Sequence, residues 1–154
     1  MKKLLVLFVV IFFTATSVYS QGNFRFGANG GIPVGDVEDI SNFHVGTDVA
    51  YMFNVAEMLD VGAMVGYSHY FADSDDAQFL PIAASGRFGL SSLYLGADLG
   101  YAIGIDDGND GGFYYRPLVG YKIGKLGIAA SYEGISMDGG WSFNSINLGI
   151  EFGL

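Results

Sequence analysis

The last stretch of the chain, residues 144–154, constrains the fold most, because it alternates strictly between two kinds of side chain. Every second position is apolar, and the positions between are small or polar. The apolar set is Ile146, Leu148, Ile150, Phe152 and Leu154. Successive side chains of a strand point to opposite faces, so this pattern predicts a strand with one apolar and one polar face.

The same alternation recurs upstream and predicts eight extended segments in all. Each is close to the length of about 9 to 11 residues that a tilted membrane-spanning strand needs. The segments are residues 23–32, 42–53, 59–71, 79–90, 93–104, 113–123, 126–136 and 142–154. The pattern therefore predicts an all-β fold, an eight-stranded antiparallel up-and-down transmembrane β-barrel.

The connections between these segments alternate between long and short. The long ones are rich in Asp and Gly and cover residues 33–41, 72–78, 105–112 and 137–141. The short ones cover residues 54–58, 91–92 and 124–125. Gly124 stands at the first central position of a two-residue hairpin, where a type II′ turn needs a positive φ.

The first twenty residues have the composition of a leader. Lys2 and Lys3 are followed by the apolar run 4–13 and by the largely small-residue stretch 14–20. This order predicts a signal peptide cut before Gln21, with the barrel domain at residues 21–154. A transmembrane anchor is the alternative, but the apolar run is much shorter than the ~20 residues that a spanning helix needs.

The charge of the remaining chain limits its partners. Without Lys2 and Lys3 it keeps five basic and sixteen acidic residues, a formal charge of −11. Such an acidic chain is not expected to bind nucleic acid, which is recognised by basic surfaces. The absence of cysteine excludes thiolate catalysis and disulfide bonds.

The two faces of the predicted strands differ in a way that suits a membrane. In residues 93–104 one face is apolar, and the other carries Asp98 among glycines, Ala102 and Tyr94. A soluble lipocalin-like β-barrel, the alternative fold, would have an apolar interior and a charged outer face. The apolar faces of this chain carry no charge, so we expect them to face lipid. Outward aromatic residues gather near the strand ends and predict two interfacial girdles: Phe24, Tyr51, Phe53, Phe88 and Phe152 at the short-turn rim, and Phe43, Tyr67 and Tyr115 at the loop rim.

The leader, the eight alternating strands and the apolar last strand resemble the small eight-stranded outer-membrane β-barrel family, which includes the OmpX-like and OmpA transmembrane barrels. The resemblance covers residues 22–154. It implies a place in the outer membrane, contact with outer-membrane lipid, and help from the insertion machinery and periplasmic chaperones. In that family the last strand usually ends in an aromatic residue, whereas this chain ends in Leu154 with Phe152 two positions earlier. Gln21 after the predicted cut also resembles exported proteins of the Bacteroidetes type.

Every charge within a predicted strand falls on the inward face. These nine predicted structural lumen charges are Arg25, Asp48, Asp60, Arg87, Asp98, Arg116, Lys122, Glu133 and Glu151. Four bases against five acids predict paired charges in a narrow closed core, because an unpaired buried charge costs several kcal/mol. An eight-stranded barrel is just wide enough for side chains to occupy its interior.

The depth of each residue along its strand predicts three cross-strand ion pairs, which are Arg25–Glu151, Asp60–Arg87 and Arg116–Glu133. For Asp48 and Asp98 only Lys122 and His44 are plausible nearby partners, and their pairing stays open. Inward glycines are expected to leave room for the long side chains, at Gly27, Gly62, Gly96, Gly120 and Gly149.

The long connections hold ten of the sixteen acidic residues and neither Lys nor Arg. Residues 106–111 (DDGNDG) superficially resemble a calcium loop. The spacing lacks the alternate oxygen ligands and the distal Glu of an EF-hand, so we expect solvated turns and predict no metal site.

Catalysis by a Ser–His pair is not expected. His44 faces inward, whereas His69 has lipid-face parity and its neighbour Ser68 points the other way. No Ser, His and acid set is predicted to share one face at one depth, so the sequence predicts no catalytic residue and no cofactor.

These observations predict a monomeric structural or interaction protein rather than an enzyme. It would be a small closed barrel that contributes to envelope integrity and presents short acidic loops. A narrow porin or cation-selective channel using the acidic mouth is the alternative, and the near balance of lumen charges argues against it. An adhesion module is a third possibility, which the short loops disfavour.

Overall fold

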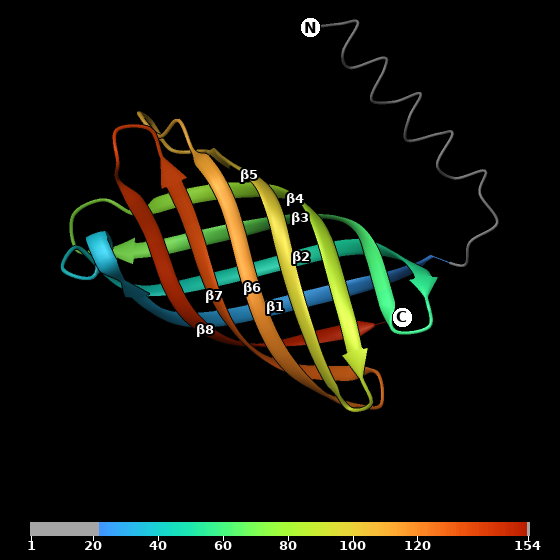
Figure 1. The fold of residues 1–154 in the computed structure, drawn as a ribbon. Helices are drawn as coiled ribbons and strands as arrows, with labels where there is room; N and C mark the ends of the chain where they lie inside the picture. The colour runs from blue at the N-terminus through green and yellow to red at the C-terminus, as the bar shows by residue number, and fades with distance from the viewer. Residues whose placement is uncertain (1–21, 154) are drawn as a thin grey trace, which may run out of the picture.

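The computed structural model describes residues 22–153, which form one closed barrel (Figure 1). Each strand pairs antiparallel with its neighbours in sequence, and the last strand closes the ring against the first. The strands are β1 (Asn23–Val34), β2 (Ser41–Ala56), β3 (Leu59–Ala72), β4 (Ala77–Leu90), β5 (Leu93–Gly104), β6 (Gly112–Ile123), β7 (Leu126–Met137) and β8 (Ser142–Gly153). The predicted fold class is confirmed. The predicted leader, its cut before Gln21 and the terminal Leu154 lie outside the described residues.

Within the described part of the chain, one short helical turn interrupts the strands. The 3-10 turn η1 (Gly35–Val37) follows β1 and lies beside β8, with Val37 buried. Within residues 22–153 no helix is long and apolar enough to cross a membrane.

The three tight connections are all two-residue turns, at residues 57–58, 91–92 and 124–125. Gly124 has φ 64° and Lys125 does not share the positive φ, as the predicted type II′ turn requires. The connection predicted at residues 54–58 is shorter than expected, because β2 continues to Ala56 through an irregular register after Asn54. The long connection predicted at residues 33–41 is also shorter than expected, because β1 continues through Pro33 and Val34, which pair with β8.

The predicted alternation of faces is confirmed strand by strand. On β5 every second residue from Leu93 to Ile103 is exposed, whereas Tyr94, Asp98 and Ala102 are buried inside. On β8 the outward residues Ile146 and Leu148 are 53% and 67% exposed. The exposed face is thus a continuous apolar surface around the barrel, and the polar groups are gathered within.

Two prolines leave local gaps in the backbone ladder. Pro81 lies where the β3–β4 register breaks between Val65 and Ser68. Pro117 lies where the β6–β7 register breaks between Tyr115 and Leu118. Proline lacks the N–H that a ladder needs, so each gap is the local cost of placing proline within a strand.

Outward aromatic residues meet in clusters near both ends of the barrel. Near the short turns, Tyr51 contacts Phe24 and Phe53 with ring centroids 4.9 Å apart in each pair. Near the long loops, Phe113, Tyr115 and Tyr132 form a stack, and Phe71 stacks on His69 at 4.1 Å. These positions fit the two aromatic girdles that the sequence predicts.

Candidate functional site

The interior of the barrel is the candidate site, because most of the strand charges meet there. The structure buries six of the nine predicted lumen residues, namely Arg25, Asp48, Arg87, Asp98, Arg116 and Glu133. Asp60 and Glu151 are half-buried near the short-turn mouth, and Lys122 is exposed there. The buried charges therefore extend along the lumen from the short-turn mouth, which Arg25 and Arg87 line, toward the loop end.

Arg116 connects two acidic residues at the centre of this interior. Its Nη1 contacts Asp48 Oδ2 at 2.9 Å, and its Nη2 and Nε contact Asp98 Oδ2 at 2.7 and 2.8 Å. Asp98 also accepts hydrogen bonds from Ser85 Oγ and from Arg87. The planar guanidinium offers five donors in a fixed fork, so one arginine can contact two carboxylates. Asp48 Oδ1 has no hydrogen-bond partner among the described residues.

Arg87 and Arg25 continue the network toward the short turns. Arg87 Nη2 contacts Glu151 Oε1 at 2.7 Å, while its Nη1 contacts Asp98 Oδ1 at 2.9 Å. Arg25 Nε lies 3.7 Å from Glu151 Oε1, and its Nη2 donates to Ser85 Oγ at 3.0 Å. Three arginines and three carboxylates, Asp48, Asp98 and Glu151, thus form one connected set.

Of the three ion pairs that the sequence predicts, one is present in this network and two are not. Arg25–Glu151 is present, whereas the predicted pairs Asp60–Arg87 and Arg116–Glu133 are wrong as ion pairs. Asp60 does face Arg87 in the ladder, but it accepts a hydrogen bond from Asn54 instead. The half-buried carboxylate of Asp60 keeps part of its hydration. The more deeply buried Asp98 therefore gains more from an ion pair with Arg87.

Asp48 and Asp98 obtain partners that the sequence did not indicate. Lys122 and His44 were the candidates, but both acids bind Arg116. Lys122 instead lies with its Nζ 5.5 Å from the centre of the Tyr94 ring.

Glu133 has its own polar pocket toward the loop end, which explains why it does not need Arg116. Its Oε1 accepts from Ser68 Oγ at 2.6 Å and lies 3.2 Å from His44 Nε2. The hydroxyls of Tyr70 and Tyr114 donate to its two oxygens at 3.5 and 3.4 Å. A buried carboxylate with this many partners is compensated without an arginine.

A Ser, His and acid set does share one face at one depth, contrary to the sequence prediction. His44 Nε2 lies 2.7 Å from Ser68 Oγ, and His44 Nδ1 lies 2.8 Å from Asn147 Oδ1. The prediction compared positions along single strands. It missed the stagger of the closed barrel, which brings β2, β3, β7 and β8 to a common depth. A search at the depth of His44 across all inward positions could have found the set.

This arrangement is not set up as a nucleophile and base. The Ser68 hydroxyl donates to Glu133, whereas nucleophilic activation requires the serine proton to lie toward the histidine. Ser68, His44 and Glu133 are at most 2% exposed, and the adjoining cavity measures about 10 Å³. That volume is about the minimum for one water molecule, so no substrate fits beside Ser68.

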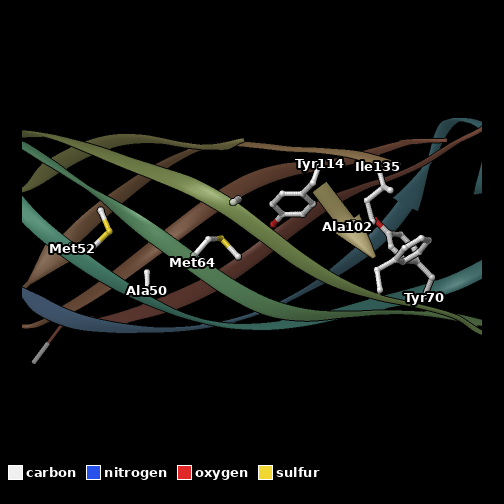
Figure 2. Close-up of a cluster of buried hydrophobic side chains, with 9 residues drawn as sticks. Ala50, Met52, Met64, Tyr70, Ala102, Tyr114 and Ile135 are labelled. Carbon is white, nitrogen blue, oxygen red and sulfur yellow. The ribbon is translucent and has the colours of Figure 1, made fainter. Parts of the chain in front are cut away.

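Large side chains pack across the loop half of the lumen. Tyr70, Phe79, Tyr114 and Ile135 are each at most 1% exposed, and Phe143 packs on Tyr70 and Phe79 with centroids 5.2 Å apart in both pairs. Figure 2 shows Tyr70, Ala102, Tyr114 and Ile135 toward one end and Ala50, Met52 and Met64 toward the other. The buried apolar cluster therefore spans much of the interior beside the charge network.

Inward glycines make room for several of these side chains, as predicted. A Cβ on Gly27 would lie 2.7 Å from Asp48 Oδ2, and one on Gly96 would lie 2.6 Å from Arg87 Cδ. A Cβ on Gly120 would meet the Tyr94 ring. Gly62 and Gly149 differ, because a Cβ there would meet the backbone carbonyls of Tyr51 and Ala28 rather than a long side chain.

Aspartates of the acidic loops accept hydrogen bonds from neighbouring backbone N–H groups, which hold the loops in place. Asp36 Oδ2 accepts from the Ser142 N–H at 3.2 Å. Asp106 is partly desolvated, which raises its pKa, but hydrogen bonds from Asn109 Nδ2 and the Gln78 N–H outweigh this and lower the pKa below its usual value. Within residues 22–153 no three His, Asp or Glu side chains are placed to hold a metal ion.

A smaller set of polar contacts joins β3 to the loop that follows it. His69 Nε2 contacts Asp76 Oδ2 at 2.9 Å, and Asp76 Oδ1 accepts from the Ala72 N–H at 2.9 Å. The Ala72 N–H and His69 both lower the pKa of Asp76. The sequence placed His69 correctly on the outer face, but the return of the chain toward it depends on the loop conformation.

Comparison with known proteins assigns the fold. No protein-family model and no curated protein matches the chain. Among solved structures, the crystal structure of Ail, the attachment invasion locus protein of Yersinia pestis, is similar with a TM-score of 0.59 at 16% identity, covering 88% of this chain and 99% of that one. The N-terminal β-barrel domain of Pseudomonas aeruginosa OprF gives 0.55 at 17%, covering 87% and 100%. Neisserial surface protein A gives 0.53 at 18%, covering 85% and 96%.

These similarities define a membrane β-barrel fold of the outer-membrane type. More particularly, the chain has the architecture of the small eight-stranded outer-membrane barrels, because its own ring is closed by eight strands.

Proposed function

We propose that this chain is a non-enzymatic, monomeric barrel of the outer membrane whose role is structural, with a lumen closed to solutes and short acidic loops at the surface. The outer face of the barrel supports a position in lipid. Exposed apolar side chains lie on every strand, and so much exposed apolar surface would be unfavourable in water. Insertion machinery and periplasmic chaperones would be its partners during assembly.

The single observation that carries the closed lumen is the network from Asp48 through Arg116, Asp98 and Arg87 to Glu151. These contacts run from one wall to the other, and the buried aromatic cluster lies on their loop side. The cavities beside Arg116 measure only about 20 and 10 Å³. A hydrated ion needs a continuous water path, which such volumes do not provide.

A surface-binding role is the less favoured part of this proposal. Ail is named for attachment and invasion, but the loops of this chain are confined to residues 35–40, 73–76, 105–111 and 138–141. Loops of this size offer little area compared with the roughly 800 Å² per partner of a standard protein interface.

Single-channel recording in a planar bilayer tests the proposal. The protein purified from membranes is first checked for the heat-dependent gel mobility of a folded barrel, and we then expect no current. Steady cation-selective openings that disappear in the Asp106→Asn, Asp107→Asn variant would overturn the closed lumen and establish the narrow channel instead. Failure to enter lipid would overturn the membrane location.

A further inference from the structure

The short-turn mouth contains an open cavity of about 290 Å³. Its charged lining consists of Arg25, Arg87, Lys122 and Lys125 against Asp60 and Glu151. Four of the five basic residues that follow the leader therefore line one cavity in a chain that is otherwise strongly acidic.

The two acidic residues of this cavity already have partners. Glu151 binds Arg87 at 2.7 Å and lies 3.7 Å from Arg25, and Asp60 accepts from Asn54 Nδ2 at 2.8 Å. Lys122 and Lys125 are exposed and form no ion pair with any carboxylate of residues 22–153. The lining consequently keeps a formal excess of two positive charges.

Buried donors without acceptors lie in the same lining. Arg25 is 8% exposed, and its Nε and Nη1 have no hydrogen-bond partner among the described residues. The hydroxyl of Tyr94, which is 2% exposed, likewise has none. Buried donors are normally satisfied, and each one left unpaired is destabilising, so an acceptor that enters this cavity would relieve that cost.

We propose that the short-turn mouth is a binding site for a phosphate-type oxyanion. The two lysines would attract the anion at the rim, and small adjustments of Arg25 and Tyr94 would present their unused donors to it. Arginine and lysine together are the usual protein groups for phosphate. Phe24 and Met52 line the same cavity, so the apolar part of a phosphate ester also finds a surface there.

Titration calorimetry on the full protein, purified from membranes in neutral detergent, tests this site. One arm uses inorganic phosphate and the other uses short-chain phosphatidylglycerol. Binding in both arms assigns the site to phosphate groups in general, and binding of the lipid alone assigns it to a phospholipid headgroup. Absence of binding in both arms overturns the proposal.

Matched variants separate a site from general charge attraction. We expect Lys122→Met, Lys125→Met to weaken binding at least tenfold, and Arg25→Met to do the same, while Arg25→Lys retains part of the affinity. The control Asp107→Asn, Asp110→Asn changes the net charge by two at the opposite end and should leave affinity within twofold. A gain of affinity in the control as large as the loss in the lysine variant would show attraction by net charge alone and overturn the proposal. If Arg25→Met lacks the heat-dependent gel mobility of a folded barrel, the Lys122→Met, Lys125→Met variant still tests the site, because both lysines are exposed.

Discussion

Arg116 Nη1 contacts Asp48 Oδ2 at 2.9 Å although the two residues come from opposite walls of the barrel. Arg116 lies on β6 and Asp48 on β2, which are four strands apart in either direction around the ring. The narrowness of an eight-stranded barrel allows this contact, because a long side chain reaches across the lumen.

Replacing Arg116 by Met should therefore be strongly destabilising. Asp48 would lose its 2.9 Å contact with Arg116, and Asp98 would lose one of its two arginines. We expect the free energy of unfolding to fall by about 3–5 kcal/mol, since a buried charge is left uncompensated. Urea unfolding in lipid vesicles, followed by circular dichroism, measures it. Lys125→Met on an exposed turn is the control, expected within ~0.5 kcal/mol, and a similar loss in both variants would contradict the role of the network.

Replacing Ser91 by Gly should stabilise the barrel. Ser91 is the one described residue other than glycine with a positive φ, at 64°. Side chains in this region cost about 1–2 kcal/mol, which glycine avoids, so the urea midpoint should rise. Ser92→Gly in the same turn lacks that strain and should be neutral or slightly destabilising. Equal shifts for the two variants would show that the backbone conformation of Ser91 is not the cause.

Replacing Gly120 by Ala should destabilise by about 1–3 kcal/mol, the usual cost of overpacking. The added Cβ would meet the Tyr94 ring, which itself packs in a buried cluster with Leu118 and Ala129. Gly89→Ala is the matched control, because its nearest neighbour is the Met58 carbonyl oxygen at 3.9 Å. Unfolding midpoints of the two variants that coincide would contradict the packing argument.

The loop after β3 should loosen in acid. Asp76 has its pKa lowered from 3.8 by the Ala72 N–H and by His69. A carboxyl with a depressed folded pKa contributes stability above the unfolded value of about 3.9, and that contribution is lost as pH falls through the folded pKa. The protection factor of the Ala72 amide in hydrogen exchange should therefore drop below about pH 4. Asp76→Asn should abolish this dependence, and a flat profile in the parent protein would refute it.

A lysine on the outer face should lower the free energy of unfolding more, the deeper in the bilayer it lies. Leu148 is 67% exposed near the middle of β8, so Leu148→Lys in a bilayer should cost about 2–4 kcal/mol. Ile123→Lys at the end of β6 should cost only about 0–1 kcal/mol. Vesicle unfolding of both variants measures the difference, and equal costs would contradict a lipid-facing surface.

The sequence was sufficient for the strands and their faces, because each depends on a local alternation. The outward set of β5 and the positive φ of Gly124 both follow from residues adjacent in the chain. The ends of the strands were less predictable. They depend on ladder partners in other strands, as the pairing of Val34 with Asn144 shows.

The partners inside the lumen were harder to predict, because neighbouring strands were not the only possible sources. Arg116 and Glu133 lie on adjacent strands but bind other groups, since Asp48 reaches Arg116 from the opposite wall. Ser68 and His44 were missed for a related reason. Their contact depends on the tilt and stagger of the closed ring, which strand parity alone does not determine.

The ion pairs across the lumen have a mechanical consequence. Arg116–Asp48 joins β6 to β2, and Arg87–Glu151 joins β4 to β8, so the two contacts brace the ring along diameters about a quarter-turn apart. Lateral pressure from a bilayer tends to flatten a thin tube, which shortens one diameter and lengthens the other. With a brace along each, flattening in either direction must strain a buried charge contact, and the cross-section stays round.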